Sequence, residues 1–212
     1  DSNLDHHNID FETPLMSLPY LFNTDIVTIP SMTSYLSADQ KKIKLWTERL
    51  TKDTFKVGIC WQGSKSKVDF GRSFPLILFE DISKLTNVEL INLHKGEGES
   101  QIEDIHFNLT SLGEDFDSGK NAFVDTAAVM SNCHLIITSD TAIAHLAGAL
   151  GCATWVMLKK VPDWRWMLKR NDSPWYPNMK LYRQNEKNNW KSVFEIIKKD
   201  LELLTTQKKR IR

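Results

Sequence analysis

Apolar positions along the chain fall into short blocks separated by polar, turn-forming stretches. The blocks that predict buried strands cover residues 55–61, 88–93, 134–137 and 153–158, with weaker ones at 104–109 and 180–182. Helical spacing of apolar residues recurs between them, at 37–50, 76–85, 122–131, 142–150 and 190–204. Strands that alternate with helices of about ten residues predict an α/β fold, in which helices cover both faces of a parallel sheet.

The first helix and the two ends of the chain carry separate signals. Ser37 followed by Gln40 predicts a capping box at the start of that helix. Residues 1–36 are polar and loop-like, interrupted by prolines, and the last eight residues, 205–212, predict a solvated basic tail. A globular domain is therefore expected over residues 37–204.

Composition narrows the class of protein. Lys and Arg together number 27, as do Asp and Glu, so the net charge is zero and no nucleic-acid partner is expected. No apolar run reaches membrane-spanning length, and no signal peptide is evident. The three cysteines lack CxxC spacing and lie in or beside apolar runs, which predicts reduced thiols in a cytoplasmic protein.

The stretch from 133 to 152 is the most informative part of the sequence. A strand there meets a helix through the small polar residues Ser139, Asp140 and Thr141. The first turn of such a helix has unpaired N–H groups and partial positive charge, which suit a phosphate. His145 follows one turn later on the same face and is a further candidate ligand residue. The alternative is an ordinary α/β crossover with Asp140 as a plain N-cap.

Candidate ligand residues also follow the first two strands, because ligands bind at the carboxyl ends of parallel strands. After the first strand, Gln62 and Gly63 precede Arg72, whose planar guanidinium suits a diphosphate. After the second strand, Lys95 and Gly96 are placed to meet a phosphate or a ribose. An exposed loop without a ligand is the alternative for Lys95.

Five segments in the same order give the chain a family resemblance. PLMSLP at 14–19, GICWQGS at 58–64, RSFPL at 72–76, LHKGEG at 93–98 and DTAAVMSNCHLIITSDTAIAHLAGALG at 125–151 carry it. The chain resembles the C-terminal half of bacterial glycosyltransferases found in TPR-repeat proteins. Those are similar to the ADP-heptose heptosyltransferase family and, more remotely, to O-GlcNAc transferases.

The resemblance implies a fold and a division into domains. The fold would be Rossmann-like, the C-terminal domain of a GT-B-type glycosyltransferase. Residues 1–36 would be the remnant of a preceding domain, and residues 37–204 a nucleotide-sugar-binding domain. Asp125 and Thr126, which match the family's DTAA segment, would present backbone groups to the base or ribose, or simply cap their helix.

The implied reaction is transfer of a sugar from a nucleoside diphosphate to a hydroxyl of a glycan, lipid or protein acceptor. The helix N-terminus at 140–141, Arg72 and Lys95 would stabilise the leaving group. The general base would come from a missing N-terminal domain or a partner chain, so no catalytic residue is assigned and the chain alone is expected to be inactive. The family often has a His at the position of Glu12, and this departure leaves that segment without a catalytic assignment.

Other readings remain open beside the transferase. The chain would alternatively be a non-catalytic module that binds a sugar nucleotide or a protein, or a GT-B-fold epimerase. Asp115 and Asp117 spell a DxD string, but similar families work without metal, so neither a metal nor a cofactor is expected. The aromatic residues Trp164, Trp166, Trp175 and Tyr176 would either wall a sugar pocket or pin the long 159–179 loop to the core. An exposed apolar surface is expected near residues 14–30.

Overall fold

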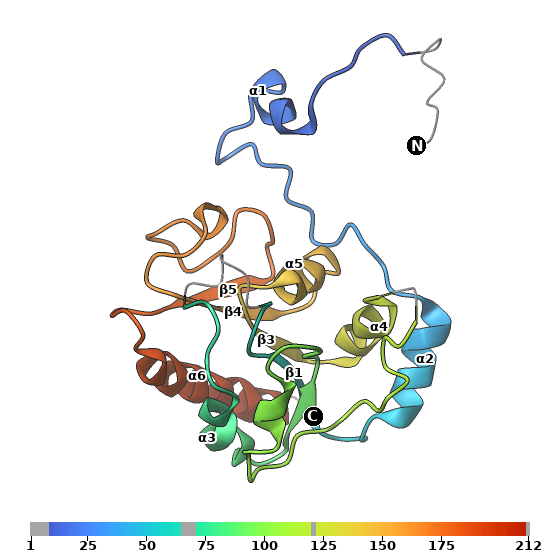
Figure 1. The fold of residues 1–212 in the computed structure, drawn as a ribbon, viewed down its shortest axis with the longest axis vertical. Coiled ribbons are helices and arrows are strands. Elements are labelled where there is room, and N and C mark those ends of the chain that lie inside the picture. Colours follow the sequence, from blue (N-terminus) through green and yellow to red (C-terminus); the bar gives the residue numbers. More distant parts are fainter. Residues whose placement is uncertain (1–8, 65–70, 120–121, 211–212) are drawn as a thin grey trace.

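Five parallel strands form one sheet in the order β2-β1-β3-β4-β5 (Figure 1). The computed structural model describes residues 9–64, 71–119 and 122–210, with side chains up to 207. The strands are β1 Phe55–Cys60, β2 Val88–Asn92, β3 Leu135–Ser139, β4 Thr154–Leu158 and β5 Met179–Arg183. Val57 in β1 lies opposite Leu90 of β2 and Leu135 of β3. The predicted parallel sheet is confirmed, and β1 pairs with β2 on one side and with β3 on the other.

The strand predicted at 104–109 is wrong. The chain there makes only an isolated bridge, in which Thr110 exchanges two backbone hydrogen bonds with Leu90 and Asn92 of β2. Ile105, Phe107 and Leu109 nevertheless pack against the core. The alternating pattern therefore reflects one buried side of an extended segment that forms no ladder.

One face of the sheet is covered by helices α2 Gln40–Arg49, α4 Val124–Asn132 and α5 Ala142–Ala149. Their apolar side chains meet those of β1 and β3, with Trp46 of α2 and Met130 of α4 almost fully buried. The small residues Ala144 and Ala147 of α5 are completely buried. They allow this helix to lie close to the strands it covers.

The opposite face is covered by α6 Trp190–Arg210 and by a short 3₁₀ turn, Leu76–Phe79, that leads into α3 Glu80–Ser83. The ring of Phe194 packs edge to face on those of Phe74 and Phe79, with centroids 5.3 and 5.0 Å apart. Helices on both faces were predicted and are confirmed. The helix predicted at 76–85 is instead a 3₁₀ turn and one α turn, and α6 continues to residue 210, into the predicted tail.

The predicted capping box at the start of α2 is wrong by two positions. Asp39, not Ser37, is the N-cap, and its Oδ1 accepts a hydrogen bond from the backbone N–H of Lys42 at 2.9 Å. A carboxylate at this position also interacts favourably with the positive end of the helix dipole. Asp39 therefore takes the role that the sequence pattern gave to Ser37.

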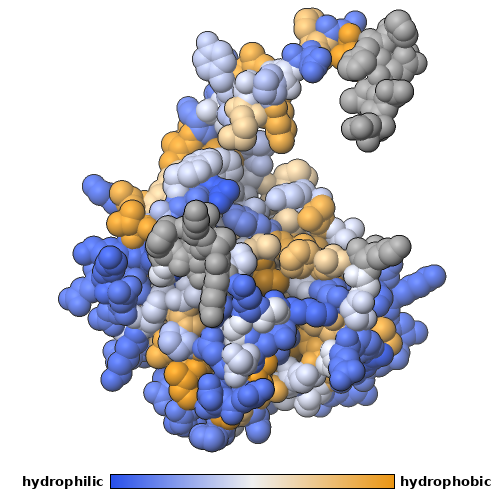
Figure 2. All heavy atoms as spheres, in the orientation of Figure 1, coloured by the Kyte–Doolittle hydropathy of each residue, from blue (hydrophilic) through white to orange (hydrophobic). Residues whose placement is uncertain are grey.

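The N-terminal segment, defined here as residues 9–32, extends away from the sheet (Figure 1). It holds a 3₁₀ turn, Leu15–Ser17, and the single-turn helix α1 Leu18–Leu21, neither of which was predicted. Most of its apolar side chains are exposed as expected, and Figure 2 shows hydrophobic patches along the segment. Residues 1–8 of the predicted N-terminal remnant and residues 211–212 of the predicted tail lie outside the described residues.

The chain joins the domain at residues 33–36, defined here as the anchor. The backbone N–H groups of Tyr35 and Leu36 both donate to the carbonyl of Ala149, at 2.9 and 3.0 Å, at the end of α5. Gly151 follows with φ +75°, and a Cβ there would lie 2.6 Å from the carbonyl oxygen of Thr33. Only glycine suits this position, which holds the anchor against α5.

Candidate functional site

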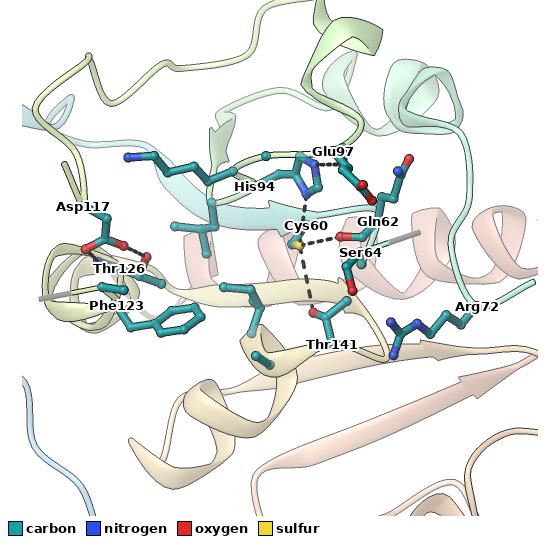
Figure 3. Close-up of a pocket in the computed structure, with 17 residues that line it drawn as sticks. Cys60, Gln62, Ser64, Arg72, His94, Glu97, Asp117, Phe123, Thr126 and Thr141 are labelled. Carbon is teal, nitrogen blue, oxygen red and sulfur yellow. Dashed lines mark hydrogen bonds between the residues drawn. The ribbon is translucent and has the colours of Figure 1, made fainter. Parts of the chain in front are cut away.

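A cavity of about 520 Å³ opens at the carboxyl ends of β1, β2 and β3 (Figure 3). It lies beside the junction of β1 and β3. The chain passes from β1 to β2 on one side and then crosses to β3 on the other side of β1, and α/β sheets bind ligands at such switch points. Of the residues predicted to bind ligand, those that line it are Gln62, Gly63, Arg72, Lys95, Gly96, Thr126 and Thr141. We call it the switch-point cavity.

The end of β1 forms the floor of this cavity. The Sγ atom of Cys60 lies 3.5 Å from Nδ1 of His94 and 4.0 Å from Oγ1 of Thr141. Burial raises the pKa of the Cys60 thiol to about 11, so the thiol is neutral at pH 7. Cys60 therefore ties three elements together as a packed thiol and is not a reactive nucleophile.

The amide of Gln62 has a fixed orientation in the wall. The N–H of Leu76 donates to Oε1 of Gln101 at 2.9 Å, so Nε2 of Gln101 is left to donate to Oε1 of Gln62 at 3.1 Å. Nε2 of Gln62 is buried and has no acceptor among the described residues. An unpaired buried donor favours an oxygen-bearing ligand at this wall over an apolar one.

Arg72 lies against Gly63 in the lining of the cavity. A Cβ at position 63 would lie 2.8 Å from Nη2 of Arg72, so the absence of a side chain there makes room for the guanidinium. Ser73 helps to hold the loop, because its Oγ accepts a hydrogen bond from the N–H of Gly63 at 3.3 Å. The cation thus reaches the cavity from a defined position.

The loop after β2 forms the opposite wall. His94 stacks on Trp61, with ring centroids 4.2 Å apart, and its Nε2 lies 2.8 Å from the carbonyl of Glu97. Burial lowers the pKa of His94, so its imidazole is neutral at pH 7. Lys95 lines the cavity, but its Nζ donates to the carbonyl of Phe116. That bond must break or be shared before Lys95 can meet a phosphate.

The first turn of α5 closes the cavity on the β3 side. Thr141 is its N-cap, has no side-chain capping bond and points into the cavity (Figure 3). The N–H groups of Ala142 and Ile143 lie in the first helical turn, which has no intrahelical acceptors, and no side chain caps them from Thr141. Ser139 is fully buried at the end of β3, and Asp140 lies half-buried outside the cavity lining. The predicted N-terminal binding turn is thus built by Thr141 and its successors, with Asp140 beside it.

The two residues of the DTAA segment face in different directions. The carboxylate of Asp125 accepts from Nε1 of Trp46 at 2.8 Å and lies 2.9 Å from Nζ of Lys42, beneath α2 and outside the cavity lining. Thr126 lines the cavity, but its hydroxyl donates to Asp117. Backbone N–H groups of both residues also donate to Asp117, at 2.9 and 3.4 Å. These groups are therefore engaged within the protein.

The same contacts explain the DxD string. Asp117 accepts bonds at the N-terminus of α4, and Asp115 pairs with Arg49 at 2.8 Å. No group of three or more His, Cys, Asp or Glu side chains in the described ranges is arranged to hold a metal ion. Nor does this part of the chain contain a helix long and apolar enough to cross a membrane.

His145 belongs to a second cavity, of about 440 Å³, on the other side of the first turn of α5. Its lining residues are Pro30, Tyr35, His145, Trp164, Arg165, Trp175 and Tyr176. We call it the aromatic cavity. Nδ1 of His145 lies 3.1 Å from the hydroxyl of Tyr176, and its ring stacks on Trp166 at 5.2 Å. Sequence reasoning missed Tyr35, because nothing in its local pattern shows that the anchor carries it to α5.

Three solved glycosyltransferase structures are similar to this chain. ADP-heptose LPS heptosyltransferase II of E. coli matches with a TM-score of 0.59 and 11% identity, over 82% of this chain and 54% of that one. E. coli heptosyltransferase WaaC, solved with ADP, matches with a TM-score of 0.52 and 14% identity, over 94% and 59%. A glycosyl transferase family 9 protein of Veillonella parvula DSM 2008 matches with a TM-score of 0.53 and 14% identity, over 73% and 44%.

These matches establish the fold. The chain has the Rossmann-like α/β fold of heptosyltransferases and related glycosyltransferases, as predicted, and it spans about half the length of these three structures. No family model and no curated protein sequence matches the chain. The assignment of an activity therefore depends on the geometry of the site.

Proposed function

We propose that the switch-point cavity binds a nucleoside-diphosphate sugar and that the chain is the donor-binding half of a GT-B glycosyltransferase. The observation that best supports this proposal is that the N-terminal turn of α5 and the guanidinium of Arg72 line one cavity at the switch point of the sheet. Both are fixed positive groups, and a diphosphate is the part of a nucleotide sugar that needs them. The unpaired amide of Gln62 adds a donor to the same wall.

The same groups suit the chemistry of transfer. Negative charge grows on the diphosphate as the glycosidic bond breaks, and donors already in position stabilise that charge without reorganising. A general base must also deprotonate the acceptor hydroxyl. Glu12 is exposed and does not line the cavity, and Asp117 is occupied at the start of α4. The proposal therefore assigns the base and the acceptor site to a second domain or partner chain, and this chain alone is expected to be inactive.

Several finer features belong to the same proposal. The acceptor would be a glycan, a lipid or a protein hydroxyl, and the reaction would need neither a metal nor a cofactor. Residues 1–36 would be the end of a preceding domain, in a cytoplasmic protein with TPR repeats. The second candidate is binding without transfer. The contacts of Asp117 favour it, because this cavity-lining carboxylate already accepts hydrogen bonds at the start of α4.

The first test is binding of nucleotides to the 212-residue chain. ADP, GDP, UDP and CMP, with their sugar conjugates, should be compared by thermal shift and calorimetry. At least one nucleoside diphosphate is expected to bind, and Arg72→Ala should weaken it by about 10- to 100-fold, the range for a charged hydrogen bond. Arg170→Ala is the matched control, because Arg170 is bound to Asp172 away from this cavity.

Two results would contradict the proposal. One is equal affinity of Arg72→Ala and the unchanged chain for every nucleotide. The other is a bound nucleotide located at the opposite edge of the sheet. Sugar transfer or donor hydrolysis by this chain as a monomer would leave the binding site intact but would refute its description as half of a two-part enzyme.

A further inference from the structure

The aromatic cavity differs from the switch-point cavity in its walls and in its charge. It is built by three separate parts of the chain: the N-terminal segment and anchor, helix α5, and the 159–179 loop. Its aromatic rings belong to Tyr35, His145, Trp164, Trp175 and Tyr176. The sequence singled out most of these residues, and nucleotide binding gives them no role.

The rings are held in place by specific contacts. Nε1 of Trp175 donates to the carbonyl of Arg165 at 3.0 Å, and the ring of Trp164 meets that of Trp175 edge to face at 6.1 Å. Tyr176 packs on Gly148, where a Cβ would lie 2.5 Å from its ring. The walls are thus positioned before any ligand arrives, which lowers the entropy cost of binding.

Charge is almost balanced in this cavity. Arg165 is its only cation among the described lining residues, and Nε of Arg165 lies 2.9 Å from Oδ1 of Asp163. Burial, and then the charge of Arg165, lower the pKa of His145, while Asp140 and Asp163 oppose the shift. The imidazole is therefore neutral at pH 7. A phosphate would find one already paired guanidinium here, so the cavity suits an uncharged ligand.

The remaining chemistry is that of aromatic faces beside hydrogen-bonding edges. Trp164 is 67% exposed, although its ring contacts Trp175 edge to face, so much of this large ring can still be covered by a ligand. His145, the hydroxyl of Tyr176 and the guanidinium of Arg165 stand next to the rings. A pyranose has the matching surfaces, since its C–H face packs on aromatic rings and its hydroxyls both donate and accept hydrogen bonds.

We propose that the aromatic cavity is a saccharide subsite that binds an uncharged pyranose ring between Trp164, Trp175 and Tyr176. The subsite extends the proposed function but does not depend on nucleotide. His145 follows Thr141 by four residues, about 6 Å along α5, so the two cavities are separated by one helical turn. A sugar in the subsite is either the donor's own or part of the acceptor.

The test uses the 212-residue chain and the methyl glycosides of glucose, galactose, mannose and N-acetylglucosamine, without nucleotide. Saturation-transfer NMR and tryptophan fluorescence would measure their binding. At least one glycoside is expected to bind with millimolar affinity, and Trp164→Ala should weaken it by about tenfold. Leu168→Ala is the matched control, because Leu168 is an exposed apolar residue of the same loop that does not line this cavity.

Trp164 is exposed, so its replacement is not expected to impair folding, and Trp175→Phe offers a second variant that keeps a ring. The proposal is overturned if none of the four glycosides binds, or if binding is the same in both variants and in the unchanged chain. It is also overturned if adenosine or uridine displaces the glycoside, because the cavity would then hold a base.

A competition experiment distinguishes the two sources of the sugar. If a nucleotide sugar displaces the methyl glycoside, the subsite holds the donor's sugar. If both bind at once, it holds a sugar of the acceptor. Either result supports a saccharide subsite. Failure of every nucleotide to bind would contradict the proposed donor function. The glycoside measurement would still test the saccharide subsite, because it is made without nucleotide.

Discussion

The sheet domain and the N-terminal segment use apolar residues in opposite ways. Phe79 and Ile137 in the domain are completely buried, whereas Phe22 and Val27 in the segment are 75% and 84% exposed. The anchor at 33–36 lies between the exposed segment and the buried core of the domain. Apolar residues that touch no core do not stabilise the fold they are attached to. Exposed apolar surfaces of this kind commonly mark interaction sites, and our proposal assigns the contact to a preceding domain.

The largest expected effect is the contrast between two phenylalanines. Phe79→Ala should lower the free energy of unfolding by about 3–5 kcal/mol, because it leaves a cavity in the aromatic cluster that packs against α6. Phe22→Ala should change it by less than about 0.5 kcal/mol. Urea unfolding of both variants measures the difference. Similar losses would mean that the segment packs on the domain in solution.

A smaller effect is expected from the carboxylate beneath α2. Asp125→Ala should cost about 1–3 kcal/mol, because Nε1 of Trp46 and Nζ of Lys42 lose their buried acceptor. Asp172→Ala, which removes an exposed partner of Arg170, should cost less than about 1 kcal/mol. Unfolding curves for both variants would settle the order, and a larger cost at Asp172 would contradict it.

The contribution of Asp125 should depend on pH. Burial alone raises the pKa of Asp125, but hydrogen bonds from Lys42 and Trp46 outweigh it and hold the pKa below its usual value. A depressed carboxylate pKa stabilises the fold above the unfolded pKa, about 3.9, and this stabilisation is lost as the pH falls through the folded value. The gap between the unchanged chain and Asp125→Ala should therefore narrow below about pH 4. A gap independent of pH would refute the charged role of Asp125.

The cap of α2 provides a third, more modest effect. Asp39→Ala should cost about 1 kcal/mol, since the N–H of Lys42 loses its acceptor and the helix its N-terminal negative charge. Ser37→Ala should be nearly neutral. Thermal unfolding of the pair tests the correction directly, and a greater loss at Ser37 would restore the capping box that the sequence suggested.

The smallest expected effect is the removal of residues 1–28. The free energy of unfolding should stay within about 0.5 kcal/mol, because the described side chains among them, those of residues 9–28, lie outside the core. Self-association should decrease, since an exposed apolar surface is lost. Urea unfolding and light scattering measure the two quantities. A clear loss of stability would show that the segment belongs to the fold.

The sequence predicted the sheet and its helices because burial imposes a period on each element. The strand prediction failed at 104–109, because an extended segment buried on one side has the same alternating pattern as a strand. The capping prediction failed at Ser37, because the carboxylate of Asp39 caps the helix instead. The loops after β1 and β2 and the first turn of α5 were predicted together because parallel strands end at one edge. The local sequence pattern could not predict the direction in which each side chain points. In the structure Asp125 contacts Trp46, and His145 contacts Tyr176.

The strand order also has a consequence for the way the chain folds. β1 pairs with the nearby β2 on one side, but its other edge stays open until β3 arrives from much further along the sequence. Contacts between distant segments form slowly, because a long loop must close first. During synthesis, β1 and β2 emerge before β3 and leave an unpaired edge that can join other chains. The switch-point cavity exists only after that pairing is complete, so a nucleotide would recognise only finished molecules.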